Sequence, residues 1–193
     1  GDGRMREIAE DAGGNSVNRD RMWHYTEGIT NFDPVWPNHG IRILPGPSSL
    51  WLDATGKRLP GPLFPGFDTL GTLEHLRGTG YDYSWFVLNK AIIRKEFALS
   101  GSEQNPDLTG KSLRGVLGRA TADVPGPVQK FLEHGEDFLT AGSVPELVAA
   151  MNELAKSSTD GAAPVLSAES ILAELQARDR EIANPFSKDA QVT

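Results

Sequence analysis

The chain has no cysteine among its 193 residues. It can therefore form no disulfide, no zinc site with thiolate ligands and no catalytic thiolate. It also has no run of about 18 apolar residues, so the sequence offers no transmembrane helix. Basic residues are few, with 19 Lys and Arg against 26 Asp and Glu and a formal net charge of −7. This balance argues against nucleic acid and against an anionic membrane surface as partners.

Metal and nucleotide motifs are also missing. The four histidines do not have the spacing of a metal site, so we expect no bound metal. The stretch RGTGYDY, residues 77–83, lacks the Lys and Ser/Thr of a P-loop, and GxGxxG does not occur. We therefore expect that this chain does not hold a dinucleotide-binding half by itself. The lack of cysteine is compatible with a cytoplasmic location, which we expect.

The order of apolar and turn-forming residues predicts an α+β fold, with a small antiparallel sheet early in the chain and several packed helices later. IRILP, residues 41–45, has the pattern of a strand, and SSLWLDATGKRL, residues 48–59, that of a hairpin with Gly56 at positive φ. Residues 84–99 predict a largely buried helix, although SWFVL could be a strand leading into it. Residues 157–164 predict a flexible surface loop. Further helices are expected over residues 3–12, 112–120, 128–132, 143–155 and 167–183.

The stretch RMWHYTEGITNFDPVWPNHG, residues 21–40, has an unusual density of aromatic side chains. Trp23, His24 and Tyr25 are consecutive, and Glu27 follows closely. An aromatic wall with a His and a Tyr suits a flat, apolar ligand, because both side chains add a polar group. The same aromatics could equally form the core of a small sheet domain, and Tyr81 and Tyr83 carry the same ambiguity.

Several segments in sequence order resemble one flavoprotein family. The chain is similar to the capping, or substrate, domain of the superfamily of fumarate reductase, succinate dehydrogenase and 3-ketosteroid Δ1-dehydrogenase, and most similar to the branch labelled FAD-binding dehydrogenase. The resemblance rests on GDG (1–3), MWHYTEGI (22–29), LWLDATGKRL (50–59), GYDYSWFVLNKAIIRKEF (80–97), SVPELVAAMNELA (143–155) and RDREIANPFSKD (178–189).

The resemblance implies that residues 1–193 are a single cap domain from a larger flavoenzyme, without the flanking FAD-binding domain. FAD would be bound mainly by other parts of the same polypeptide, and that FAD-binding domain would be the main partner. The implied reaction moves a hydride between a small apolar substrate, with ring ketones of the steroid type as a first candidate, and flavin N5. The segment alone is expected to be inactive.

The resemblance also implies roles for particular residues. Asp2 matches an aspartate that lies against FAD, and His24 and Tyr25 are the candidate catalytic bases. Phe67 in GFD, residues 66–68, stands where the dicarboxylate enzymes have a proton-donating Arg. Phe cannot bind a carboxylate as Arg does, so this position predicts an uncharged substrate region. The candidate substrate-binding residues are Trp23, Glu27, Phe67, Tyr81 and Tyr83.

A different class of function is also compatible with the sequence. A non-catalytic module that binds a ligand or a protein would use the same aromatics as a recognition patch. It would be expected to have linker-like ends rich in Pro, Ser and charge. GDGRM and NPFSKDAQVT are not strongly of that kind.

Overall fold

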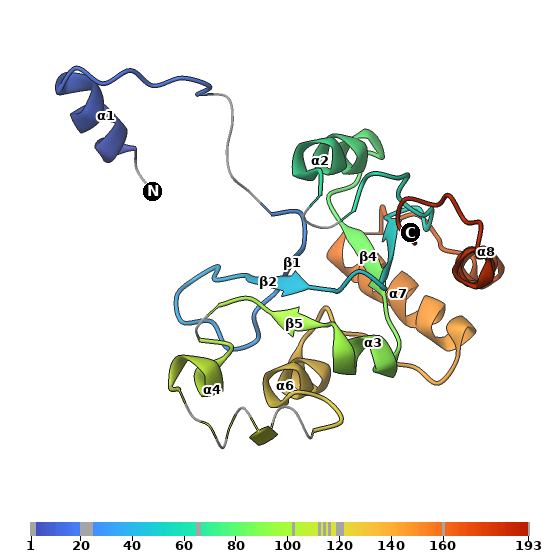
Figure 1. The fold of residues 1–193 in the computed structure, drawn as a ribbon. Coiled ribbons are helices and arrows are strands. Elements are labelled where there is room, and N and C mark those ends of the chain that lie inside the picture. The colour runs from blue at the N-terminus through green and yellow to red at the C-terminus, as the bar shows by residue number, and fades with distance from the viewer. Residues whose placement is uncertain are drawn as a thin grey trace.

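The computed structural model describes residues 3–19, 25–64, 67–101, 103–111, 113, 115, 117–118, 122–159 and 161–192. The predicted α+β class is confirmed (Figure 1). The described helices are α1 (Arg4–Asp11), α2 (Thr69–Gly78), α3 (Lys90–Lys95), α4 (Pro106–Thr109), α6 (Gly126–His134), α7 (Val144–Ser158) and α8 (Ala168–Ala183). The strands are β1 (Gly28–Ile29), β2 (Ile41–Leu44), β3 (Leu50–Asp53), β4 (Ser84–Val87) and β5 (Ala98–Leu99).

The strands form two small antiparallel sheets rather than the single sheet that the sequence predicts. The first sheet has the order β1-β2-β5, with Gly28 opposite Arg42 and Ile43 opposite Leu99. The second sheet pairs β3 with β4 in a register of Leu50 with Val87 and Asp53 with Ser84. The chain passes from β2 in the first sheet directly to β3 in the second.

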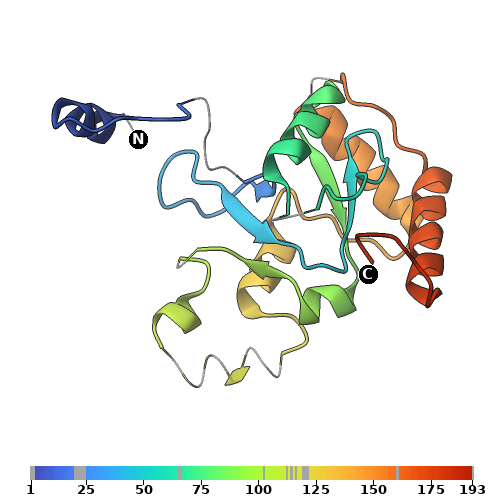
Figure 2. The ribbon, with the colours of Figure 1, turned by 45° about the horizontal axis from the view of Figure 1, so that its top comes forward.

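Each sheet has its own apolar cluster. The first sheet packs on α6 (Figure 1), where Ile41, Phe97 and Phe131 are buried. The second sheet places Leu50 and Leu52 against α7 and α8 (Figure 2), with Met151 and Ile171 buried there. Trp51 points to the opposite face, as the alternation of the hairpin predicts, and packs with Leu59 and Leu76.

The hairpin of residues 48–59 is confirmed, and its turn depends on Gly56. Asp53 donates its N–H to Lys57 O at 2.8 Å, and Leu59 donates to Trp51 O at 3.0 Å. Gly56 has φ +81°, the conformation that the sequence predicts for it. The Asp53 carboxylate closes the turn by accepting hydrogen bonds from Thr55 N at 2.8 Å and Lys57 N at 3.2 Å.

The prediction of one buried helix over residues 84–99 is wrong, and the strand that we allowed as its alternative is observed. Ser84–Val87 forms β4 because four consecutive residues pair with β3, and only six residues, Lys90–Lys95, form α3. Asn89 begins α3 by accepting the Ile92 N–H at 3.0 Å. Tertiary pairing has therefore overridden a helical pattern of apolar residues.

The other helical predictions have mixed outcomes. α6, α7 and α8 are confirmed. Ser143 caps α7 by accepting the Glu146 N–H, and the Glu146 carboxylate accepts the N–H of Gly142, one residue before the cap. The predicted helix 112–120 falls largely outside the described residues. α7 extends to Ser158, two residues into the predicted loop 157–164.

α1 forms at the predicted place, and none of its residues is buried. Met5 and Ile8 are 76% and 59% exposed, and α1 lies apart from the two sheets in both views (Figures 1 and 2). Gly3, with φ +79°, occupies the N-cap position of α1 and provides no side-chain cap.

Candidate functional site

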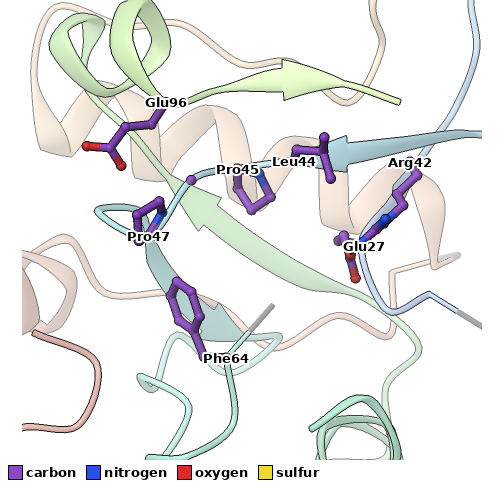
Figure 3. A pocket seen from close by; sticks show the side chains of 8 residues that line it. Glu27, Arg42, Leu44, Pro45, Pro47, Phe64 and Glu96 are labelled. Atoms are coloured by element: carbon purple, nitrogen blue, oxygen red, sulfur yellow. Dashed lines mark hydrogen bonds and ion pairs between the residues drawn. The ribbon is translucent and has the colours of Figure 1, made fainter. Parts of the chain in front are cut away.

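Two neighbouring cavities lie along the first sheet. The smaller one, here called the Phe64 pocket, has a volume of about 180 Å³ and includes Leu44, Phe64 and Glu96 in its lining (Figure 3). The larger one, here called the Tyr25 hollow, has a volume of about 880 Å³ and includes Tyr25, His39 and Asp137. Glu27 and Arg42 line both. These two residues therefore determine the charge at the junction of the cavities.

The buried Glu27 forms an ion pair with the partly exposed Arg42 across β1 and β2. Arg42 lies opposite Gly28, so its side chain comes beside Glu27, one residue before β1. Arg42 Nε and Nη2 each lie 2.8 Å from Glu27 Oε1. Glu27 Oε2 accepts hydrogen bonds from Thr26 N at 3.0 Å and Thr26 Oγ1 at 2.8 Å. Both carboxylate oxygens are thus satisfied, as the burial of Glu27 requires.

Tyr25 contacts the other side of the same cation. The Arg42 guanidinium carbon lies 4.0 Å from the centroid of the Tyr25 ring, which is the geometry of a cation–π contact. Half of Tyr25 remains exposed to the hollow. Arg42 therefore links a buried carboxylate to a partly open aromatic ring and fixes their relative positions.

The Phe64 pocket has a second carboxylate, and its oxygen atoms also accept hydrogen bonds from the protein. Glu96 accepts the N–H of Ser48 at 2.9 Å and the hydroxyl of Ser48 at 2.8 Å. Gly46, with φ +83°, allows this approach, because a Cβ there would lie 2.5 Å from Glu96 Cβ. Figure 3 shows Glu96 at one end of the pocket and the Glu27–Arg42 pair at the other, with Pro45 and Leu44 between them and Phe64 to one side, below Pro47.

The structure brings together two of the predicted site residues, Tyr25 and Glu27. Asp2, Trp23 and His24 lie outside the described residues. Phe67 is 75% exposed and is not among the residues that line either cavity. Its N–H donates to Phe64 O at 3.0 Å, so the residue nearer the pocket is Phe64.

Tyr81 and Tyr83 lie in the loop between α2 and β4, and neither lines either cavity. Their rings lie 6.1 Å apart, and Tyr83 lies 5.5 Å from Trp85, each pair in an edge-on arrangement. Burial, with added repulsion from Tyr81 and Asp82, raises the pKa of the Tyr83 phenol. Tyr83 therefore stays protonated at neutral pH, as a hydrogen-bonding rather than a basic group.

Apart from Tyr25 and Glu27, the residues that line the cavities were not among the predicted site residues, and Arg42, Phe64 and His39 are examples. Arg42 is in the predicted strand 41–45 but contacts Glu27 from 15 positions away, and Phe64 is in a proline- and glycine-rich segment without periodicity. His39 follows Pro37 and Asn38, a pair typical of a tight turn. That turn is the feature of the sequence that could have identified His39 as a candidate site residue. The pairings themselves depend on strand register, which the sequence does not specify for so short a β1.

The described residues can be tested against FAD, the cofactor that the resemblance implies. The pyrophosphate of a dinucleotide is usually bound by a glycine-rich turn between a parallel strand and a helix. The described strands are antiparallel, and α1, which begins after Gly3, has the Glu7 carboxylate in its first turn. In the described ranges the residues do not form a pyrophosphate cradle.

Two further observations apply to the part of the chain that the structure describes. It contains no group of three or more His, Asp or Glu side chains arranged to hold a metal ion. None of its helices has both the length and the apolar character needed to cross a bilayer.

Known proteins similar to this chain include two mycobacterial enzymes. A KsdD-like steroid dehydrogenase of Mycolicibacterium smegmatis is 62% identical over 192 residues, and one of Mycobacterium tuberculosis is 64% identical over 193 residues. Both matches cover 100% of this chain but only 34% and 33% of the relatives. The chain thus spans about a third of the length of these relatives. No solved structure matches it significantly.

The family described as "FAD binding domain" matches the chain over residues 1–193. This match conflicts with our expectation that the FAD-binding domain is absent from the chain, and that expectation is withdrawn. It supports the expectation of FAD as the cofactor. Because the match extends over the whole sequence, the chain belongs to the FAD binding domain family.

Proposed function

We propose that this chain forms the substrate-side cap of an FAD-dependent dehydrogenase that acts on a neutral ring ketone of the steroid type. The family assignment and the names of the relatives support the cofactor and the substrate class. When FAD is bound it supplies the redox chemistry. The residues of this chain bind and orient the substrate and exclude water.

The observation that carries the proposal is the charge balance of the Tyr25 hollow. Among the described residues that line it, Arg42 is the one Lys or Arg, and Glu27 already neutralises it at 2.8 Å. A dicarboxylate would need an unpaired cation. Taking Arg42 from Glu27 would leave a buried carboxylate without its partner, which costs about 3–5 kcal/mol. The hollow is therefore suited to a neutral ligand.

The individual residues have the following proposed roles. Tyr25 offers its exposed ring and hydroxyl to the ligand, and Glu27 acts indirectly by holding Arg42. His24 remains the second candidate base, Trp23 a candidate apolar wall and Asp2 a candidate FAD contact. Phe67, Tyr81 and Tyr83 remain predicted substrate contacts, although none of them lines either cavity. The FAD-binding sequence of the same polypeptide is the proposed partner of the cap.

Glu27→Gln tests the charge balance directly. The amide keeps the size of the side chain and removes its charge, so Arg42 becomes an unpaired cation beside the hollow. In the natural polypeptide that contains this chain, we expect succinate to bind at least about tenfold tighter, from one new charge-assisted hydrogen bond. We expect binding of a neutral steroid ketone to change by less than about threefold.

Glu153→Gln is the matched control, because Glu153 is exposed on α7. It should change neither affinity in equilibrium binding measurements. The proposal would be contradicted if the unmodified protein bound succinate as tightly as the neutral ketone. It would also be contradicted if Glu27→Gln left succinate binding unchanged.

A further inference from the structure

His39 enters the Tyr25 hollow from a loop that holds its ring in one orientation. Its backbone N–H donates to Trp36 O at 3.1 Å, which closes a turn with Pro37 and Asn38 in the central positions. Asn38 has φ +60°, and proline followed by a residue of positive φ is typical of a type II turn. The Trp36 ring stacks on the His39 ring with centroids 3.7 Å apart.

The hydrogen bonds around His39 determine which ring nitrogen has the proton. The N–H of Val35, which can only donate, points to Nδ1 at 3.4 Å. Asn31 Oδ1 accepts the Asp33 N–H at 3.0 Å, so the Asn31 amide group Nδ2 is the atom that faces Nδ1 at 3.5 Å. Two donors therefore converge on Nδ1, which must present its lone pair. The ring is in the Nε2–H tautomer.

The Nε2–H group is left to interact with a ligand. It has no hydrogen-bond partner among the described residues, and it is not among the buried polar atoms. His39 lines the hollow together with Tyr25 and the neutralised Glu27–Arg42 pair. A donor that protein groups hold in one tautomer loses little freedom when it binds, which favours recognition of an acceptor.

We propose that His39 Nε2–H donates a hydrogen bond to a carbonyl oxygen of the ligand in the Tyr25 hollow. A carboxylate ligand would face the Asp137 carboxylate, which also lines the hollow, whereas a neutral carbonyl would not be repelled by it. The inference rests on the proposed function for its substrate class. It adds a residue that recognises the oxygen of the ketone rather than its ring system.

The test compares two ligands and two substitutions in the natural polypeptide that contains this chain. Androstanone has one ring carbonyl, and androstane has the same ring system without it. His39→Asn keeps an acceptor near the Nδ1 position and removes the Nε2 donor, whereas His39→Gln keeps an N–H near the Nε2 position. His134→Asn is the matched control, because His134 is exposed on α6 and lines neither cavity.

His39→Asn should weaken androstanone binding about tenfold, the value of one hydrogen bond, and leave androstane binding unchanged. His39→Gln should recover part of the loss, and the control should change neither affinity. An equal loss for both ligands would overturn the inference, since it would indicate a structural role alone. Unchanged androstanone binding, or no measurable binding by the unmodified protein, would also overturn it.

Two further measurements separate this inference from the proposed function. ¹⁵N NMR of the imidazole, assigned by comparison with His39→Gln, should show a protonated Nε2 and an unprotonated Nδ1 at neutral pH. The opposite tautomer would overturn the inference whatever the enzyme does. Flavin reduction by androstanone tests the proposed function alone, because binding that depends on His39 does not require turnover.

Discussion

Gly56 illustrates how single residues constrain this fold. It has φ +81°, and a Cβ there would lie 2.9 Å from Leu166 Cδ2 and 3.0 Å from Ile171 Cδ1, in the apolar cluster under the second sheet. The glycine thus provides both the turn of the hairpin and the space that α8 and the loop before it occupy.

Gly56→Ala should lower the free energy of unfolding by about 2–4 kcal/mol, from left-handed strain and overpacking together. Gly80→Ala is the control, because Gly80 has φ +83° and a Cβ there would meet nothing within 4 Å. Gly80→Ala should lower the free energy of unfolding only by the cost of the left-handed backbone conformation, about 1 kcal/mol. Equal losses in urea denaturation would contradict the packing argument.

The sequence predicts the roles of some single residues but not of others. The turn chemistry at Gly56 is local, so it could be predicted from Asp53 and its neighbours. Tyr25 and Glu27 could be named as candidates because they have the right chemistry in an unusual segment. Arg42 and His39 could not, because their roles depend on contacts with Glu27, Asn31 and Val35 that only the folded loops and strands create.

Among the helices and strands, the accuracy of the predictions differs between the early and late parts of the chain. α7 and α8 have capping serines and long apolar faces, so local signals were sufficient to find them. β4 and α3 are too short for the spacing of their apolar residues to distinguish a helix from a strand. Pairing with β3 makes residues 84–87 a strand. The buried residues of α7 are Val148, Met151 and Ala155.

The segment after α8 is held against the hairpin by one ion pair. Arg58 Nη1 lies 2.5 Å from Asp189 Oδ2, and Arg58 Nη2 lies 3.0 Å from Asp189 Oδ1. Gln191 Nε2 donates to Leu59 O at 2.9 Å. The hydrogen bond from Arg58, more than any other contact, holds the pKa of Asp189 below its ordinary value.

A carboxyl whose pKa is lowered by folding stabilises the fold above its unfolded pKa, and the contribution is lost as the pH falls through the folded value. For Asp189 the loss begins near pH ~4, the ordinary value for Asp, and continues below it. We therefore expect amides 186–192 to lose protection in this acid range in hydrogen exchange corrected for intrinsic rates.

Asp189→Asn should lower the protection of these amides at neutral pH and reduce its dependence on acid. Asp11→Asn on α1, an exposed position, is the control and should leave the protection unchanged. If Asp189→Asn kept the full pH dependence, the ion pair would not be what holds the segment.

In the molecule as a whole, the two sheets have different roles. The first sheet holds the Tyr25 hollow and the Phe64 pocket, whereas the second sheet packs with α7 and α8 around a separate apolar cluster. The α+β class followed from the order of short strands and later helices. The separation into two sheets did not, because β2 and β3 are adjacent in sequence and would ordinarily be expected to pair.

The most direct test of the account is anaerobic visible spectroscopy of the natural polypeptide that contains this chain, with FAD bound. Addition of a neutral steroid ketone should bleach the visible band of the oxidised flavin, and addition of succinate should leave it unchanged. Bleaching by succinate but not by the ketone would contradict the assignment of the hollow to a neutral ligand. A polypeptide that stays colourless when FAD is added would contradict the flavoenzyme assignment itself.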